Sequence, residues 1–221
     1  MATAPREPRK DGAATRIRIL QAAGELFAAL GYAEASNKAV AAKAEVDLAS
    51  INYHFASHSG LYQAVLTEAH GRLIQLEALE ALASSDLPAA AKVTRVIDAL
   101  IDTALNDSGW HARILARELL APSSHLTVLL ETVGQPKFAV VARILSEATG
   151  VPLGDPALLR CMVSIAAPCL MLLVAGKGLP GPAQQVRAMP RDALTEHMHR
   201  FALAGLAAIG QAHGTRAPAG A

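Results

Sequence analysis

The sequence predicts an all-α fold, with a small N-terminal unit followed by a larger helical domain. Hydrophobic residues make up 52% of the chain and aromatic residues only 4%, and apolar positions recur at helical spacing. Strands favour β-branched and aromatic side chains, whereas an alanine-rich chain favours helices. The 221 residues suffice for one or two domains. The apolar content excludes an intrinsically disordered chain.

Charge and cysteine content narrow the class of protein. Lys and Arg (20) nearly balance Asp and Glu (19), so net charge neither indicates nor excludes a nucleic-acid partner. Cys161 and Cys169 lie too far apart along one expected helix to form a disulfide within it. The N-terminus lacks the apolar segment of a secretory signal, and the longest apolar run, 161–175, is shorter than a membrane span. We therefore expect reduced cysteines, no membrane partner and a cytoplasmic protein.

Capping and helix-breaking residues divide the N-terminal part into three expected helices. Residues 1–11 are polar and contain proline, so we expect a flexible arm there. The first helix should cover 11–30, because apolar residues recur every three or four positions and Gly31 follows. The serine at the start of 36–43 and the aspartate at the start of 47–54 can cap two short helices, joined by a three-residue turn.

The rest of the chain shows helical periodicity, and no segment is typical of a strand. We expect helices from 57 or 59 to about 84, and at 89–105, 109–121, 123–149 with a break near 134–136, 156–175 and 191–211. Gly and Pro predict a loop over 176–190, and the small residues of 213–221 favour a flexible tail.

The two short helices form a candidate helix-turn-helix, whose second helix would lie in the major groove of DNA. Ile51 and Phe55 face inward, and small outward side chains let the helix backbone approach the bases. Asn52 can form two hydrogen bonds with adenine, and contact with a phosphate or water is an equally open role. Tyr53 and His54 can reach phosphates, with a core role for the tyrosine ring left open. A plain corner in an all-α protein is the alternative.

Basic residues are concentrated near the N-terminus although the net charge is close to zero. Over the first eighteen residues the basic side chains exceed the acidic ones by three. They are Arg6, Arg9, Lys10, Arg16 and Arg18, against Glu7 and Asp11. Positive charge here suits contact with DNA phosphates.

Two segments carry several motifs in a fixed order: ILQAAGELFAALGYAEAS and VAAKAEVDLASINYHFASHSGLYQAV. An LF…GY turn, the helix-turn-helix spacing, a YHF tripeptide and an LY pair follow one another over residues 15 to about 66. This order resembles the DNA-binding domain of the TetR family of transcriptional regulators. A later segment, ARELLAPSSHLTVLLETVGQPKF, resembles the C-terminal domain of the CecR-like branch over 110–150. The resemblance implies an all-helical homodimer in which a bound inducer changes the spacing of two DNA-reading heads.

Three residues depart from the family pattern in ways that affect DNA binding. Glu45 stands where the family usually has glycine, in a turn position that tolerates positive φ, at a cost of about 1 kcal/mol. Glu45 and Asp47 also bring negative charge near phosphates, although Asp47 can cap its helix. His58 replaces the usual lysine, so a phosphate contact there would be only partly charged at neutral pH.

The sequence thus predicts a one-component transcriptional repressor with no cofactor and no enzymatic activity. We expect a flexible arm at 1–11, a DNA-binding domain at 12–58, a ligand-binding and dimerisation domain at 59–212, and a tail at 213–221. The residues expected to contact double-stranded operator DNA are Arg16, Ser36, Lys38, Leu48, Ala49, Ser50, Asn52, Tyr53, His54 and His58. The alternatives are an activator or dual regulator, and a helical interaction or sequestering protein that has lost DNA affinity.

The C-terminal domain is expected to bind a small hydrophobic effector. An aromatic ring with convergent polar groups is typical of a pocket wall; a salt bridge of Arg117 that joins helices is the alternative. The expected effector contacts are Trp110, Arg113, Arg117, Phe138, Met162 and Cys169.

The last two helices are expected to hold a homodimer together. In the final helix an apolar stripe, with small residues beside it, can pack against a partner helix. The stripe consists of Leu194, Met198, Phe201 and Ile209, flanked by Gly205 and Ala208. We expect no metal site, because His197 and His199 point to different faces and sulfur residues in an apolar helix more often pack.

Overall fold

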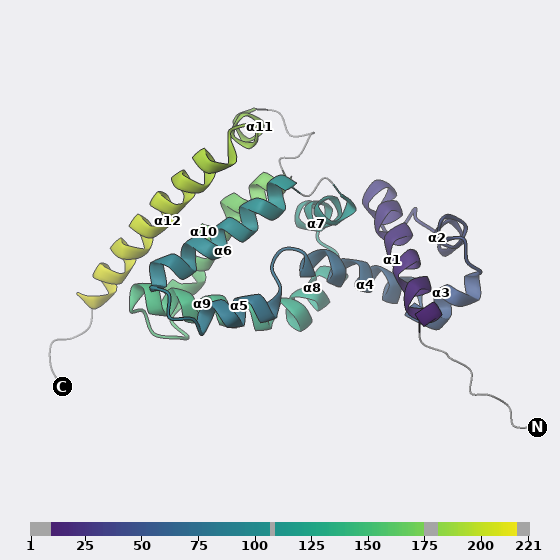
Figure 1. Cartoon of the computed structure of the whole chain (residues 1–221), viewed down its shortest axis with the longest axis horizontal. Helices are drawn as coiled ribbons and strands as arrows, with labels where there is room; N and C mark the ends of the chain where they lie inside the picture. The colour runs from purple at the N-terminus through teal and green to yellow at the C-terminus, as the bar shows by residue number, and fades with distance from the viewer. Residues whose placement is uncertain (1–9, 107–108, 175–180, 216–221) are drawn as a thin grey trace, which may run out of the picture.

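The computed structural model describes residues 10–106, 109–174 and 181–215, and every regular element within them is a helix (Figure 1). The N-terminal unit comprises α1 (Lys10–Leu30), α2 (Asn37–Ala44) and α3 (Leu48–Phe55), at one end of the elongated molecule. α4 (His58–Gly71) leads from it to the larger C-terminal part. The predicted all-α fold class is confirmed.

The C-terminal part contains the remaining helices, with α6 in contact with α5, α9, α10 and α12. They are α5 (Leu76–Ala83), α6 (Ala89–Asn106), α7 (Trp110–Leu120), α8 (Ser124–Leu129), a π-helical turn (Leu130–Gly134), α9 (Gln135–Thr149), α10 (Pro156–Val174), α11 (Pro182–Arg187) and α12 (Arg191–Gly214).

Local signals in the sequence fix the N-terminal unit as predicted. Gly31 ends α1 with a φ of 91°. Ser36 caps α2 by accepting a hydrogen bond from the Ala39 amide at 3.2 Å, and Asp47 caps α3 through the Ser50 amide at 2.7 Å. These caps set the turn between α2 and α3.

The single helix expected from 57 or 59 to about 84 is wrong, because the chain breaks between α4 and α5. The carbonyls freed at the break accept hydrogen bonds from side chains instead of from a continuing helix. Thr103 bonds the carbonyls of Arg72 and Leu73 at 3.3 and 3.2 Å, and Gln75 bonds that of Gly71 at 2.9 Å. A local side chain and one on α6 thus satisfy the end of α4, and the local periodicity does not continue across the break.

Two further segments differ from the sequence prediction. The chain does not break near 134–136: a π-helical turn, Leu130–Gly134, leads without interruption into α9. The loop expected over 176–190 contains the short helix α11, which begins with a proline at its first position. Residues 175–180, and 216–221 of the expected tail, lie outside the described residues, while α12 continues through Gly214.

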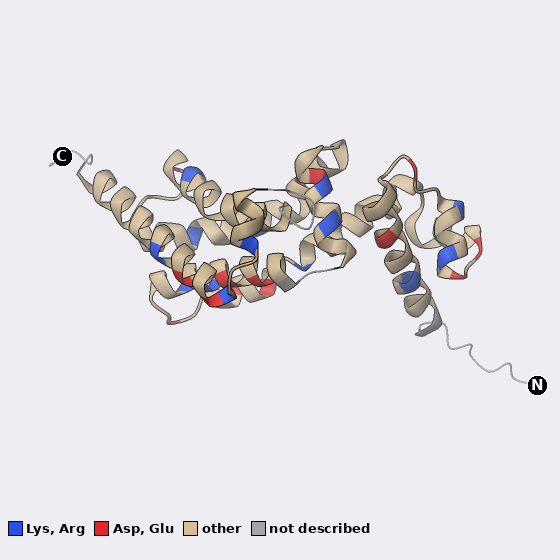
Figure 2. Ribbon diagram, turned by 90° about the horizontal axis from the view of Figure 1, so that it is seen from above, with Lys and Arg blue, Asp and Glu red and all other residues tan. Residues whose placement is uncertain are grey.

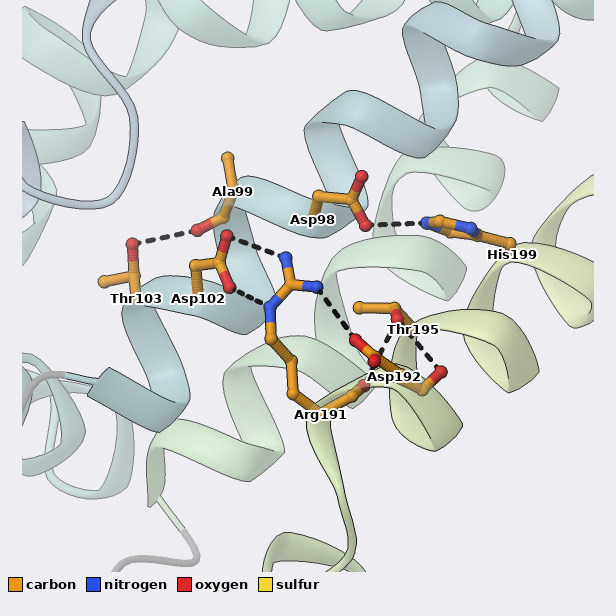
Figure 3. Close-up of polar contacts among 8 residues, drawn as sticks. All are labelled: Asp98, Ala99, Asp102, Thr103, Arg191, Asp192, Thr195 and His199. Atoms are coloured by element: carbon orange, nitrogen blue, oxygen red, sulfur yellow. Dashed lines mark hydrogen bonds and ion pairs between the residues drawn. The ribbon is translucent and has the colours of Figure 1, made fainter.

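Polar contacts attach the start of α12 to α6 (Figure 3). Arg191 donates from Nε and Nη2 to the two carboxylate oxygens of Asp102, with an Nη2–Oδ2 distance of 2.9 Å. The Arg191 hydrogen bond lowers the pKa of Asp102. His199 Nε2 lies 2.8 Å from Asp98 Oδ1 further along α12. These pairs fix how α12 lies on the C-terminal part.

α10 is the most apolar of the described helices by mean hydropathy. Among the described residues it is the one helix that is long and apolar enough to cross a membrane, a test that the core helix of a soluble protein also passes. It exceeds the apolar run recognised in the sequence, because the helix begins at Pro156. Its contacts with α6, α7 and α9 place one face in the protein core.

Candidate functional site

The outward face of α3 carries most of the side chains predicted to read DNA. Leu48 and Tyr53 are 49% and 85% exposed, and Ala49 and Asn52 are also exposed. Ile51 and Phe55 are buried, as their spacing predicts. Ser50 and His54 are half-buried between these faces. The exposed surface of α3 is therefore partly polar and partly apolar, and it includes the small side chain of Ala49.

The two acidic residues near this face have different structural roles. Asp47 accepts hydrogen bonds from the hydroxyl and the amide of Ser50, at 2.6 and 2.7 Å, and these bonds lower its pKa. Glu45 ends α2 with φ 53° and ψ 50°, the left-handed conformation that glycine adopts most easily. The backbone strain inferred for Glu45 from the sequence is therefore present.

Basic groups lie on α1 and α2 beside α3, and acidic groups lie among them (Figure 2). The Arg16 guanidinium stacks over the Phe55 ring, 5.1 Å from its centroid, and this contact fixes its position beside α3. Ser36 and Lys38 are exposed at the start of α2. Lys43 forms an ion pair with Glu25 at 2.9 Å, which joins α2 to α1. The arm residues before 10, Arg6 and Arg9 among them, lie outside the described residues.

His58 bonds within the protein instead of pointing outward to a phosphate. Its Nδ1 lies 2.6 Å from Asn37 Oδ1 and its Nε2 lies 3.1 Å from the Tyr32 carbonyl oxygen. The ring also packs on Phe27 and Tyr32, with centroid distances of 5.3 and 4.8 Å. His58 therefore ties the start of α4 to α1 and α2, and the predicted phosphate contact does not match this geometry.

The C-terminal part contains a partly open cavity of about 180 Å³. An engineered apolar cavity of roughly 150 Å³ is known to bind benzene, so this space admits a small organic molecule. Its wall is apolar except for His70 and Lys137. The lining comes from α4, α5, α6, α7, α8, α9, α10 and the π-helical turn, and includes Leu73, Val96, Leu115, Leu126, Phe138 and Met162.

The two polar residues of the wall contact one another. Lys137 Nζ lies 3.2 Å from His70 Nδ1 and donates to the His70 carbonyl at 3.1 Å. Burial and the Lys137 charge lower the pKa of His70 to about 4, so the imidazole is neutral at pH 7. Burial also lowers the pKa of Lys137. A buried cation with a neutral neighbour thus faces an apolar cavity.

Of the six predicted effector contacts, the structure brings Phe138 and Met162 together at this cavity and leaves the other four outside it. Trp110 packs against α1, where its Nε1 donates to Gln21 at 2.9 Å. Exposed Arg117 lies 3.4 Å from the Leu30 carbonyl oxygen, and Arg113 is also exposed. These residues were placed in the wall because of their chemistry. They instead lie at the junction with the N-terminal unit or on the surface.

Cys169 is buried but does not line the cavity, so its predicted effector contact is also not reproduced. The sequence reasoning missed His70 and Lys137. One signal was present: Lys137 begins a helical pattern of apolar residues that continues through Phe138, Val141 and Ile144. A lysine on an apolar face has to find a buried partner or an unusual environment.

Comparison with sequence families identifies the chain. Residues 19–65 match the bacterial regulatory proteins of the tetR family, and residues 89–209 match the C-terminal domain of the HTH-type transcriptional dual regulator CecR. The protein belongs to the TetR family. As a member of this family, it is a DNA-binding transcriptional regulator. No curated protein sequence matches the chain significantly.

Solved structures support the same fold for this TetR-family chain. A TetR-like regulator from Rhodococcus sp. RHA1 has a TM-score of 0.67 at 18% identity, covering 91% of this chain and 99% of that one. FadR from Bacillus subtilis, solved with stearoyl-CoA, has a TM-score of 0.67 at 17% identity, over 86% and 98%. NalD from Pseudomonas aeruginosa is the secondary repressor of a multidrug efflux pump. Its structure has a TM-score of 0.65 at 19% identity and covers 89% of this chain and 97% of its own. At these identities the likeness concerns the fold.

Proposed function

We propose that this regulator is a homodimeric repressor, released from its operator when a small molecule occupies the cavity. The cavity is the observation that carries the proposal, because the helices around it also contact the N-terminal unit. The bound FadR ligand and the repressor role of NalD, two proteins with this fold, support the assignment. Residues 12–58 would bind DNA and 59–212 would bind the effector and the second subunit.

One route from the cavity to DNA runs through α8 and α4. Leu126 and Leu129 on α8 line the cavity, and the neighbouring His125 lies 2.9 Å from the Ser59 hydroxyl on α4. Gly60 follows on α4, where an added Cβ would lie 2.2 Å from the Phe55 carbonyl oxygen. This close approach couples the start of α4 to the end of α3. Through these contacts, a shift of α8 on effector binding would reach α3, the helix proposed to read DNA.

A second route runs through α7. Leu115 and Leu119 line the cavity, while Trp110 and Arg117 contact α1 from other turns of α7. An effector that moves α7 would move α1 with it. The change in DNA affinity is limited by the effector's differential affinity for the two conformations.

The dimer interface is assigned to α10 and α12 because both carry large apolar side chains in solvent. Leu159, Val163 and Met171 on α10 are 64%, 64% and 49% exposed. Phe201 and Ile209 on α12 are 65% and 41% exposed. Exposed apolar residues arranged as stripes on two adjacent helices fit burial against a second subunit. Such a dimer would bury the exposed apolar face of α10. We place this regulator in the cytoplasm.

The test is binding of the full-length protein to a labelled fragment of its own promoter region over a range of salt concentrations. A DNA reader loses affinity steeply as salt rises, because phosphate contacts release counterions. Saturable binding with this dependence, together with lower promoter activity when the protein is present, supports the repressor. Higher promoter activity would indicate an activator. Absence of DNA binding at low salt would favour the sequestering protein, for which Glu45 and Asp47 are the motivating residues.

A further inference from the structure

Two lysines are buried among the described residues, and their surroundings differ. Lys92 is 4% exposed and its Nζ lies 2.9 Å from a carboxylate oxygen of Glu147. Lys137 is 6% exposed, and neither of its hydrogen-bond partners carries a negative charge. The acid whose charge acts on it is the exposed Glu77 on α5, which forms no ion pair with it. Lys137 is thus a buried cation without a counterion among the described residues.

The Lys137 ammonium group retains a donor that can reach a ligand. It has three N–H groups, and its two contacts among the described residues are with His70 Nδ1 and the His70 carbonyl oxygen. Because the imidazole is neutral, its Nδ1 can accept from Lys137 with the ring proton on Nε2. Lys137 is one of the residues that line the cavity, so a ligand held there is the candidate partner for the remaining donor.

The chemistry of the wall restricts the ligand. A hydrocarbon body suits the Leu, Val and Ile side chains that make up most of the lining. A neutral ligand would leave the Lys137 charge unpaired, and a cation would add a second positive charge in an apolar environment. A dianionic phosphate would carry one more negative charge than the wall can neutralise. A single carboxylate matches the one cation in charge and can accept a charge-assisted hydrogen bond.

We propose that the effector of this regulator is a small amphipathic monocarboxylate, whose carboxylate pairs with Lys137 and whose hydrocarbon fills the apolar cavity. This inference rests on the proposed function of the cavity as the effector site. The volume favours a medium-length aliphatic acid or an acid with one aromatic ring. Both share the same recognition: one negative charge at Lys137 and an apolar body against residues such as Val96 and Met162.

The experiment measures binding of matched ligands to the full-length protein by calorimetry at pH 7. Octanoate, octanol and octylamine differ in the head group, and 4-phenylbutanoate tests an aromatic body. We expect the two acids to bind at least about tenfold more tightly than octanol, and octylamine to bind most weakly. Tighter binding of octanoate than of 4-phenylbutanoate would indicate that the effector is an aliphatic acid. The reverse order would indicate an acid with an aromatic ring.

Two variants locate the carboxylate. Lys137→Met should weaken octanoate binding about tenfold or more while leaving octanol binding unchanged or tighter. Arg143→Met, an exposed residue on the same helix, removes the same charge and should bind like the unaltered protein. If Lys137→Met does not fold, the comparison of octanoate with octanol in the unaltered protein still decides the proposal.

The outcomes separate this inference from the proposed function. If octanol binds as tightly as octanoate and releases the promoter fragment, the monocarboxylate inference is overturned and the effector-responsive repressor stands. If octanoate binds through Lys137 but the complex keeps its full affinity for the promoter, the ligand class is supported and the proposed release mechanism fails. If none of the four compounds binds, the monocarboxylate inference is overturned as well.

Discussion

The N-terminal unit and the C-terminal part are both built from packed helices, but the cavity described above lies in the C-terminal part. In the N-terminal unit, Ile19, Phe27 and Ile51 are fully buried. In the C-terminal part, helices break or change type around a space of about 180 Å³. Since protein interiors are normally close-packed, an open space forfeits contacts that a ligand can restore. The C-terminal part is therefore the region whose packing a bound ligand can change, next to the DNA-binding unit.

The largest expected effect comes from the outer surface of the C-terminal part. Phe201→Glu places a charge on the exposed stripe of α12, and we expect it to dissociate the dimer. Because two linked heads bind DNA far more tightly than one, promoter affinity should fall by about 10²-fold or more. Sedimentation velocity and DNA binding report both effects. Glu196→Lys, an exposed change on the same helix, is the control, and a Phe201→Glu protein that remains dimeric would place the interface elsewhere.

The junction between the two regions should be sensitive to a single methyl group. A Cβ added at Gly24 would lie 2.3 Å from the Trp110 ring, so Gly24→Ala has to push α7 away from α1. We expect a loss of about 1–3 kcal/mol in the free energy of unfolding, measured with urea. Gly12→Ala, in the same helix, places its Cβ 4.0 Å from His54 and should be neutral or slightly stabilising. Equal stabilities for the two variants would contradict the close packing of this junction.

The buried contact between α4 and α7 offers a finer test of communication. Tyr62 donates to Glu118 at 2.6 Å, and burial together with Glu118 raises the pKa of Tyr62, so the hydroxyl stays protonated. Tyr62→Phe should lower the free energy of unfolding by about 1–2 kcal/mol, because it removes a hydrogen-bond donor from the buried carboxylate of Glu118. The Ser123 hydroxyl still bonds Glu118 in this variant. We expect promoter binding to persist while its release by a cavity ligand weakens; unaltered release would exclude Tyr62 from the route.

The smallest effect concerns acid sensitivity at the start of α12. Because Arg191 lowers the pKa of folded Asp102, their pairing contributes stability above the unfolded pKa near 3.8, and this contribution is lost as pH falls through the folded value. Both side chains are largely exposed to solvent, so the effect should be small. Asp102→Asn should therefore be less stable than the unaltered protein at pH 6, with the gap closing below about pH 4. Asp192→Asn changes an almost fully exposed side chain, so its loss of stability at pH 6 should be smaller. Equal losses for the two variants would contradict a stabilising role of the Arg191–Asp102 pair.

The same two regions differ in how much their sequence reveals. In the N-terminal unit the determining contacts are local: Ser36 and Asp47 bond amides three residues ahead, and Glu45 adopts the expected left-handed turn. The caps, the turn and the inward residues of α3 could therefore be predicted. His58 is an exception, because its partners Asn37 and Tyr32 lie 21 and 26 residues away.

The cavity depends on contacts between distant parts of the chain, which periodicity does not specify. Lys137 and His70 are 67 residues apart, and residues of α8 and α10 line the same cavity only in the folded protein. Phe138 and Met162, predicted as effector contacts, both line the cavity. Residue chemistry misplaced Trp110, because a tryptophan ring suits a helix junction, here against Gly24, as well as a ligand pocket.

The central claim, that the cavity controls the spacing of the two recognition helices, is tested most directly by measuring that spacing. A spin label at Ala42→Cys, an exposed residue of α2, gives one inter-subunit distance in the dimer. Burial raises the pKa of Cys161 and raises that of Cys169 to about 11, so the exposed thiol should label first. We predict one distance with the promoter fragment bound, and a different distance when the tightest-binding cavity ligand, octanoate among those tested, releases it. The same distance distribution in both states would contradict the account.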